Sequence, residues 1–521
     1  MKNKSLIYIL VILILVVILG VFLKVALFDE DNSSSSSTSN TTNNYNFGSG
    51  DSSSSSTVSV DSSTAETVVA KDKRGDKTYS SYDATIDLDT LKLTGTGVSV
   101  SNNKIEISKA GTYYFTGTLK DGYIEINAGD DDNVILVFDN ASITCSTTAC
   151  INGINAKNIY INLVDGTTNT FTDSSNYTVF TEDDEPNGCI FSKTDLKICG
   201  TGTLVVNANY EDGIVSKDDL IITDATVIVT SSDDAIRGKD CVDLQDANIT
   251  INAKNDAIKA TNEDDNTKGY VLINGGNYEI TAGDDGIHSE TYLIINSGNI
   301  NITKSHEGLE GAWVEINGGS VKVVADDDGI NATTGNVNAQ FGQGSSNAVM
   351  IINGGDVYVK AEGDGLDSNG SITLNGGNVV VVGTSSSGNG ALDFDASFNV
   401  TGGSLVVYGG TGMWQNPSTT STQSSVCFSA SGKSGDKVEV KDSAGNTVES
   451  FTTEKAYNAI LISNSKLTSG ETYTLYVNGS EVSSQELTSV VTSQISGEGF
   501  GGPGMGGGQM NGGQMNRGGM R

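Results

Sequence analysis

The segment 271–287 reads VLINGGNYEITAGDDGI, and its last three residues form a phrase that recurs through the middle of the chain. The phrase is an acidic residue, then Gly or Ala, then Ile or Leu, and it begins at Asp212, Asp234, Asp256, Asp285, Glu307, Asp328 and Asp364. Successive acidic positions are 22, 22, 29, 22, 21 and 36 residues apart, and polar inserts at 261–270 and 333–348 lengthen two of the steps. A fixed period of this length is typical of a solenoid, in which each repeat buries its apolar side against its neighbours.

A second phrase, Asn-Gly-Gly or Asn-Ser-Gly, keeps the same period at Asn274, Asn296, Asn317, Asn353 and Asn375. Between the two phrases lie short runs of alternating apolar and polar residues, which indicate strands. Equivalent strands of successive coils stack about 4.8 Å apart, so Ile287, Ile330 and Leu366 are expected to stack inside. The sequence therefore predicts an all-β fold: a right-handed parallel β-helix, a three-sheet solenoid with about 22 residues per coil and a small C-terminal β cap.

Acidic residues dominate the composition, with 64 Asp and Glu against 30 Lys and Arg and a net charge of -34. Such a charge repels nucleic acid phosphates and anionic lipid, so neither is an expected direct partner. It suits hard cations, above all Ca²⁺. Six cysteines without a Cys-x-x-Cys pair, together with only two histidines, argue against a zinc site. One disulfide and burial of single thiols both stay open.

Five regions are expected along the chain. Residues 1–28 are a membrane segment, either an uncleaved anchor or a signal peptide, because two lysines precede nineteen uncharged, mostly apolar residues. Residues 29–78 are a disordered stalk rich in Ser, Asn and Thr, 79–424 the parallel β-helix, 425–485 a small β unit, and 486–521 a disordered tail rich in Gly, Met and Gln. We therefore expect the protein at the extracellular face of the cell membrane, held by a single N-terminal transmembrane anchor, or secreted.

The acidic positions of the phrase should form a ladder. Stacking places neighbouring carboxylates within roughly 5 Å, where like charges repel each other. Such a ladder needs either raised pKa values or a bound cation, and a flexible set of oxygens favours Ca²⁺ over Mg²⁺ or zinc. The candidate calcium ligands are Asp234, Asp256, Asp284, Asp285, Glu307, Glu310, Asp327, Asp328, Asp364 and Asp367, with Asp393 and Asp395 continuing the line. The alternative is that each aspartate only accepts backbone N–H bonds in its turn.

The asparagine positions need no ligand, since stacked amides bond to one another and tolerate left-handed backbone. The two tryptophans, Trp313 and Trp414, suit either stacking on sugar rings or packing in the core or cap.

Basic residues are scarce, and two of them share a position. Arg237 and Lys259 each lie three residues after the acid of the phrase, at Asp234 and Asp256, so they should stack in adjacent coils. Together with Lys239 they are the candidate substrate-binding residues. Three roles stay open: charge compensation of the ladder, contact with an anionic sugar, or removal of a proton from a metal-bound uronate, as a lyase requires.

Several motifs in order carry a resemblance to a known family. They are KAGTYYFTGTL (109–119), DGTTNTF (165–171), EPNGCIFSKTDL (185–196), YEDGIVSKDDL (210–220), DDAIRGKD (233–240) and GDDGIHSET (283–291). From residue 79 to about residue 479, the chain resembles the surface carbohydrate-binding β-helix proteins of clostridia, which bind cellulose and acidic sugars and are similar to pectate lyases. The resemblance implies a right-handed β-helix, calcium at aspartate clusters, and polysaccharide binding without turnover. Cys150, Cys189, Cys199 and Cys241 depart from the expected residues.

The leading functional prediction is a calcium-dependent polysaccharide-binding protein of the cell surface, non-catalytic, whose ligand is cellulose or an acidic plant polysaccharide such as polygalacturonate. One alternative is a pectate-lyase-like β-elimination that uses calcium and Lys259 or Arg237 as the base. A structural or adhesive protein without a sugar ligand is the third.

Overall fold

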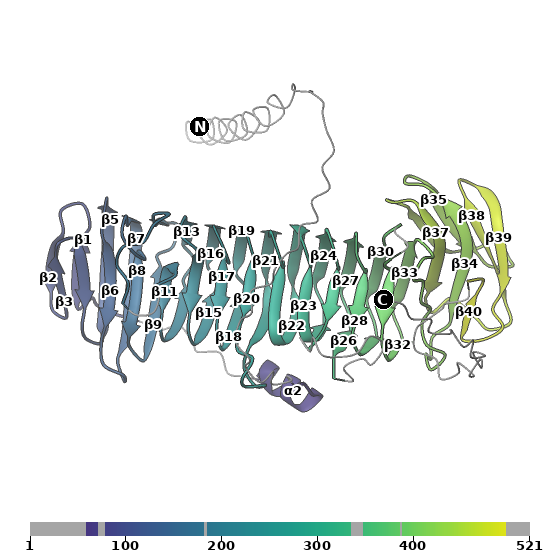
Figure 1. Ribbon diagram of the computed structural model, residues 1–521, viewed down its shortest axis with the longest axis horizontal. Helices are drawn as coiled ribbons and strands as arrows, with labels where there is room; N and C mark the ends of the chain where they lie inside the picture. Colours follow the sequence, from purple (N-terminus) through teal and green to yellow (C-terminus); the bar gives the residue numbers. More distant parts are fainter. Residues whose placement is uncertain (1–58, 71–78, 182–184, 335–346, 386–387, 496–521) are drawn as a thin grey trace, which may run out of the picture. The chain divides into compact units, whose positions relative to one another are not determined.

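The computed structural model describes residues 59–70, 79–181, 185–334, 347–385 and 388–495. In these residues the fold is all-β except for one helix, α2 (Ser62–Ala70), and most strands pair in parallel (Figure 1). The all-β prediction is confirmed. The expected membrane segment, 1–28, lies outside the described residues. Among those that are described, no helix combines the length and the apolar content needed to cross a membrane.

The chain winds in coils, and each coil adds one short strand to each of three parallel stacks, called faces 1, 2 and 3 here. Face 1 carries the acidic phrase and contains β4 (Lys104–Ile107), β6 (Tyr123–Asn127), β8 (Ile151–Asn155), β11 (Gly188–Ser192), β14 (Asp212–Ser216), β17 (Ile236–Gly238), β20 (Ile258–Ala260), β25 (Ile330–Ala332), β28 (Leu366–Ser368), β31 (Leu392–Phe394) and the first parts of β22 (Ile287–Ser305) and β23 (Leu309–Ile316).

Face 2 follows face 1 in every coil. It contains β1 (Ala84–Asp87), β5 (Gly111–Leu119), β9 (Asn158–Leu163), β12 (Asp195–Cys199), β15 (Asp219–Thr223), β18 (Cys241–Gln245), β26 (Val349–Ile352), β29 (Ser371–Leu374), β32 (Ser397–Val400) and parts of β7 (Asn133–Thr144), β21 (Tyr270–Thr281), β22 and β23. Face 3 contains β10 (Thr168–Thr172), β13 (Thr203–Ala208), β16 (Thr226–Ser231), β19 (Asn248–Asn252), β24 (Ser320–Ala325), β27 (Asp356–Ala361), β30 (Asn378–Val382), β33 (Ser404–Gly409) and the ends of β7, β21 and β22.

Apolar side chains from all three faces point inward and stack coil upon coil. On face 1, Ile258 pairs with Ile287, which pairs with Leu309, and each side chain is fully buried. The predicted stack of Ile287, Ile330 and Leu366 is confirmed, since all three have no exposed surface. Burial of one such side chain contributes roughly 1.5–3 kcal/mol, so the repeated Ile or Leu of the phrase is the main source of core stability on this face.

The small residue of the phrase is needed for close approach between coils. A Cβ added at Gly308 would lie 2.2 Å from the backbone oxygen of Gly329 in the next coil. The Asn-Gly-Gly turns have a different requirement, because Gly276 and Gly319 adopt φ values of +89° and +85°, which glycine tolerates best.

The asparagines form a hydrogen-bonded ladder, as predicted. The side-chain N–H of Asn296 donates to Asn274 at 2.8 Å, Asn317 donates to Asn296 at 2.8 Å, Asn353 to Asn317 at 2.7 Å and Asn375 to Asn353 at 2.8 Å. The ladder therefore connects five successive coils at one corner of the fold.

Antiparallel strands close both ends of the coiled region. β2 (Lys92–Gly95) and β3 (Val98–Ser101) pair antiparallel with β1 and β4. At the other end β37 (Tyr457–Ser463) pairs antiparallel with β33 and with β34 (Ser425–Gly432). A separate antiparallel sheet contains β35 (Lys437–Lys441), β36 (Thr447–Thr452), β38 (Thr472–Val477) and β39 (Ser480–Glu486).

The predicted tail, 486–521, is wrong at its start. β40 (Val491–Ser493) pairs in parallel with β34, so ordered chain continues past residue 485. The sequence around it is polar, and the pairing depends on an open strand edge that only the folded β unit provides.

The predicted disordered stalk, 29–78, is also wrong in part, because Ser62–Ala70 is the helix α2. Asp61 caps the helix by accepting the backbone N–H of Thr64 at 2.9 Å. Val60, Ala65 and Val68 are buried in a cluster with Tyr292 and Trp313 and other outward side chains of face 2. Tertiary packing thus orders a segment whose composition alone indicates disorder.

All six cysteines are buried free thiols, so none of them forms a disulfide. Both tryptophans are buried too, with 7% of Trp313 and 3% of Trp414 exposed. Trp313 lies under α2 and Trp414 in the main core, which favours packing over sugar stacking.

Candidate functional site

The carboxylates of the acidic phrase join neighbouring coils. The side chain of Asp212 accepts the backbone N–H of Asp234 at 3.1 Å, Asp234 accepts that of Asp256 at 3.1 Å, and Asp256 accepts that of Asp285 at 2.9 Å. Asp328 accepts the N–H of Asp364 at 2.6 Å in the same way. The bonding of aspartate to backbone, weighed as the alternative to a metal, is therefore present along the ladder.

From Asp234 to Asp364, the residue three positions after each acid points outward from face 1. These residues form a second row, called the charged row here, which Asp393 continues by strand register. The strand register places its members in successive coils in the order Arg237, Lys259, His288, Glu310, Asn331, Asp367 and Asp393. The predicted stacking of Arg237 on Lys259 is confirmed. The row changes from cationic to anionic along its length.

In the basic half of the row, the chain neutralises its own ladder. Arg237 forms an ion pair with Asp212, and Lys259 Nζ lies 2.5 Å from Asp256 Oδ2. Burial alone would lower the pKa of Lys259, but Asp256 outweighs it and the pKa is raised. Both Arg237 and Lys259 thus pair with a carboxylate of the ladder, as the charge-compensating role requires.

His288 continues the basic half and was missed from the sequence. Its Nδ1 lies 2.9 Å from Asp285 Oδ2 and 3.1 Å from Glu310 Oε2. Burial lowers the pKa of His288, but hydrogen bonds to Asp285, Glu290 and Glu310 together raise it well above its usual range. Its offset of three residues from Asp285 equals that of Lys259 from Asp256 and could have identified it.

In the acidic half, the described chain supplies no such cation. Oxygens of Asp328, Asp364 and Asp367 lie within 4.8 Å of one another, and none of the three forms an ion pair within the described residues. Burial, and then neighbouring carboxylates, raise the pKa of Asp367 to about 8. Burial likewise raises the pKa of Asp364 to about 7, although it accepts the N–H of Gly390, and that of Asp328 to about 6.

An unpartnered oxygen lies beside this carboxylate cluster. Asn331 stands between Glu310 and Asp367 in the charged row and is 9% exposed. Its Nδ2 donates to Glu307 at 3.0 Å, while its Oδ1 has no hydrogen-bond partner in the described structure.

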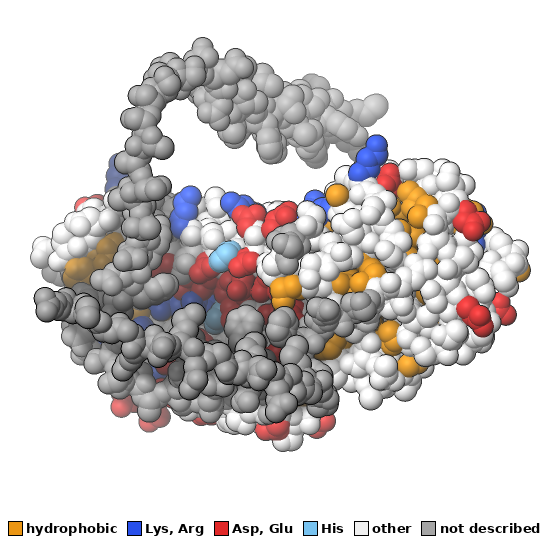
Figure 2. All heavy atoms as spheres, turned by 45° about the vertical axis from the view of Figure 1, so that its right-hand side comes forward, with side chains coloured by type: hydrophobic (Ala, Val, Ile, Leu, Met, Phe, Trp, Pro, Cys, Tyr) orange, Lys and Arg blue, Asp and Glu red, His pale blue; other side chains and the backbone are white. Residues whose placement is uncertain are grey.

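On one side of the molecule, acidic side chains gather around a histidine, with Lys and Arg beside them (Figure 2).

The other candidate ligands lie nearer the basic half or further out. Asp284 groups with Asp256 and Asp285 within 4.8 Å. The side chain of Asp327 is 44% exposed, and its Oδ2 lies 3.8 Å from His306 Nε2. Burial, and then Glu310, raise the pKa of Glu307 to about 8. A further acidic group, Asp195, Asp218 and Asp219, was not predicted.

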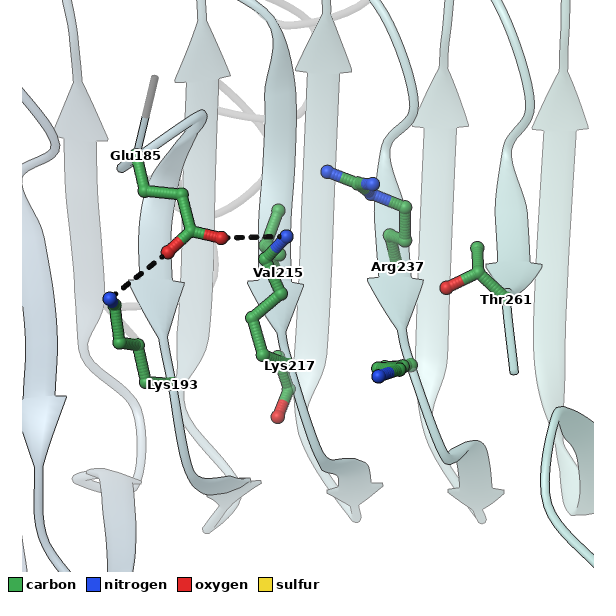
Figure 3. Close-up of a pocket in the computed structure, with 8 residues that line it drawn as sticks. Glu185, Lys193, Val215, Lys217, Arg237 and Thr261 are labelled. Atoms are coloured by element: carbon green, nitrogen blue, oxygen red, sulfur yellow. Dashed lines mark ion pairs between the residues drawn. The ribbon is translucent and has the colours of Figure 1, made fainter. Parts of the chain in front are cut away.

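A cationic groove with a volume of about 460 Å³ opens on face 1 at the basic end of the row. We call it the lysine groove; it is lined by Glu185, Lys193, Val215, Ser216, Lys217, Arg237, Lys239 and Thr261 (Figure 3). The backbone N–H of Lys217 donates to Ser192 O at 2.8 Å, and that of Lys239 to Ser216 O at 2.9 Å. Lys193, Lys217 and Lys239 are therefore equivalent positions in three successive coils.

The groove collects two of the three candidate substrate-binding residues. Arg237 and Lys239 line it, whereas Lys259 pairs with Asp256 and is not in the lining. Lys193 and Lys217 were missed. Lys217 follows Asp212 by five residues, as Lys239 follows Asp234, and this shared offset could have identified it.

The described chain is an all-β protein of stacked parallel strands. Its face 1 has the lysine groove toward one end and the carboxylate cluster toward the other. Proteins of this class suit an extended, charged ligand. A family model described as carbohydrate-binding domain-containing protein matches residues 101–390, more than half of the 521 residues. The chain belongs to this family of carbohydrate-binding domain-containing proteins.

Two known proteins are similar to parts of this chain. A carbohydrate-binding domain-containing protein of Acetivibrio thermocellus is 40% identical over 134 residues, which are 26% of this chain and 47% of that relative. This chain thus matches about half the length of that protein. A solved structure, a polysaccharide lyase-like protein from C. thermocellum in a gadolinium derivative, is 35% identical and covers 47% of this chain and 95% of its own, with a TM-score of 0.41.

Proposed function

We propose that the protein is a calcium-dependent, non-catalytic polysaccharide-binding protein whose ligand is an acidic polysaccharide such as polygalacturonate. The observation that carries the proposal is the division of face 1 into a cationic groove and a carboxylate cluster, Asp328, Asp364 and Asp367, that forms no ion pair within the described residues. Membership of the carbohydrate-binding family supports a glycan as the ligand. We also propose that the three faces wind as a right-handed parallel β-helix, which would keep the groove preorganised and lower the ordering cost of binding.

The acidic half fits calcium by its chemistry. Asp328, Asp364 and Asp367 provide carboxylate oxygens, and Asn331 provides an amide oxygen that is buried and unpartnered. An all-oxygen set suits Ca²⁺, whereas zinc prefers nitrogen and sulfur ligands. A bound Ca²⁺ would offer positive charge to uronate carboxylates that the net charge of -34 would otherwise repel.

The groove would bind uronate carboxylates directly. Lys239 forms no ion pair with any carboxylate of the described residues, so its ammonium group needs no release before it contacts a ligand. Lys217 lies one coil away, and ammonium groups repeated at the coil spacing of about 4.8 Å suit a polymer with one carboxylate per sugar.

The proposal is tested by isothermal titration of the full chain with polygalacturonate oligomers, in calcium and in excess EDTA. We expect binding in calcium and none in EDTA. Lys239→Met should weaken binding about threefold to tenfold, a range set by the small energies of solvent-exposed ion pairs. The matched control is Lys360→Met, because Lys360 pairs with Glu454 at 3.5 Å outside the groove. Full-strength binding in EDTA would refute the calcium mechanism.

The lyase alternative is followed in the same samples. A β-elimination base must accept a proton, and the raised pKa of Lys259 keeps that side chain protonated at neutral pH. We therefore expect no rise in unsaturated-uronate absorbance. A steady rise that disappears in Lys259→Ala would instead identify an enzyme.

For localisation we propose display on the outer surface of the cell membrane through residues 1–28, or secretion if that segment is cleaved. Cell fractionation with an antibody against the body of the protein separates the two.

A further inference from the structure

The lysine groove already contains an anion. Glu185, a residue between β10 and β11, places Oε2 at 3.2 Å from Lys193 Nζ and Oε1 at 2.9 Å from Lys217 Nζ (Figure 3). Its side chain is 22% exposed. One carboxylate thus bridges two ammonium groups of neighbouring coils, the arrangement that a uronate carboxylate would adopt on this ladder.

The position of Glu185 is held by its backbone as well. The backbone N–H of Thr181 donates to Glu185 O at 2.8 Å, which fixes the residue at the edge of the groove. Burial alone would raise the pKa of Glu185, but Lys217 and then Lys193 outweigh it, so the pKa lies below its usual range. The carboxylate is therefore charged at neutral pH.

The third lysine of the ladder is not engaged in this way. Lys239 occupies the equivalent position one coil beyond Lys217. It has no ion pair among the residues that the structure describes. Within the described residues, two positions of the cationic ladder are thus paired with Glu185 and the third, Lys239, has no ion pair.

Resting on the proposed function, we infer that Glu185 is an internal competitor for the carboxylates of the ligand. A uronate carboxylate that bridges Lys217 and Lys239 takes Lys217 from Glu185, which keeps its contact with Lys193. A single carboxylate gains too little binding free energy to displace Glu185 from Lys217. A polyuronate offsets the cost of that displacement through its contacts at other coils. Glu185 therefore selects for ligands with several closely spaced carboxylates, by raising the cost of binding every other anion.

The test compares wild type with Glu185→Gln in calorimetric titrations with a galacturonate pentamer and with acetate, in calcium at neutral pH. We expect Glu185→Gln to bind the pentamer about threefold to tenfold more tightly, since competing ion pairs of this exposure are weak. Acetate binding should appear only in the variant. Glu454→Gln is the matched control, because it removes the same charge from the Lys360 pair outside the groove.

The outcomes separate this inference from the proposed function. If wild type binds the pentamer and Glu185→Gln binds it equally or more weakly, Glu185 is no competitor, while the proposed function stands. If neither protein binds the pentamer, both ideas fail. Pentamer binding by Glu185→Gln alone would mean that the competitor occludes the groove fully. Glu185→Ala, with the same expected sign, provides a second variant should the glutamine protein fail to fold.

Discussion

The two halves of the charged row differ in the side chains that face the buried carboxylates of the ladder. In the basic half, the buried ladder carboxylates of Asp212 and Asp256 are matched by Arg237 and Lys259 from the chain itself. In the acidic half, Asp364 and Asp367 occupy equivalent coil positions, and the described chain supplies no cation to either. The fold is the same in both halves, and only the outward side chain differs.

This difference shows that the repeat keeps its core residues while the outward residue varies. The inward Ile or Leu and the small residue of the phrase are retained in both halves, so either half can stack. The residue three positions after the acid is free to vary, because its side chain lies outside the core. At Arg237 and Lys259 it is a cation that pairs with a ladder carboxylate, whereas at Asp367 it is a carboxylate without an ion pair in the described residues.

The largest expected effect is on stability in the basic half. Arg237→Met should reduce the free energy of unfolding by about 3–5 kcal/mol, because it leaves a buried carboxylate without its partner. The side chain of Asp212 is 2% exposed, and burial already raises its pKa to about 7 despite Arg237. Urea denaturation measures the change. Lys239→Met, in the same groove but without an ion pair in the described structure, should change stability little, and equal losses in the two variants would contradict the comparison.

In the acidic half, removing the charge of the outward side chain should raise the stability of the folded protein instead of lowering it. Asp367→Asn removes one of several crowded carboxylates, so in EDTA above pH 8 the protein should melt at a higher temperature than wild type. Calcium affinity should fall by about tenfold to hundredfold, as for loss of a group at a metal site. Calorimetric titration and scanning measure both, with Asp326→Asn as the exposed control, whose carboxylate lies 3.8 Å from Lys304. A lower melting temperature in EDTA would show that Asp367 is structural.

The pH dependence of calcium binding should follow the same carboxylates. Without metal, the pKa of Asp364 is raised to about 7 and that of Asp367 to about 8, so at pH 6 both are largely protonated. Calcium must displace those protons, so its affinity should rise by up to about a hundredfold per pH unit between pH 6 and 7, where both carboxyls carry protons, and by up to about tenfold between pH 7 and 8, where mainly Asp367 does. In EDTA, the stability of the folded protein should change with pH in the direction opposite to calcium affinity. Raised carboxyl pKa values favour the folded protein at low pH, and this stability is lost as pH rises through 7 to 8. A calcium affinity that is flat between pH 6 and 8 would exclude these carboxylates as the ligands.

The spacing of the phrase was enough to predict the coils, because one strong period fixes which residues lie inside. Ile287 and Leu366 needed no structure to be assigned to the core. The same spacing predicted that Arg237 stacks on Lys259. It could not show that Lys259 would turn toward Asp256, since the choice among nearby carboxylates depends on side-chain geometry within a few ångströms.

Two further parts of the structure could not be predicted from the repeat. The helix α2 forms because Ala65 and Val68 pack on an apolar surface of face 2, which is far away in the sequence. Amino-acid composition alone does not predict that contact. Glu185 enters the lysine groove from a connection between strands, outside the repeat. Residues outside the period are positioned by tertiary contacts alone, so the repeat predicted neither of them.

The smallest expected loss of stability is in the asparagine ladder, whose side chains are uncharged. The asparagine ladder stacks at the same coil spacing, and Asn317 both donates to Asn296 and accepts from Asn353. Asn317→Ala removes these two partly exposed bonds and should cost about 1 kcal/mol. The loss should be the same in low salt, in 0.5 M salt and with or without calcium, whereas the changes at Arg237 and Asp367 should vary with salt or calcium, because only they alter charge. A calcium-dependent loss at Asn317 would mean that stacking and cation binding are coupled through the coils, and the two halves of the charged row could then not be treated as independent.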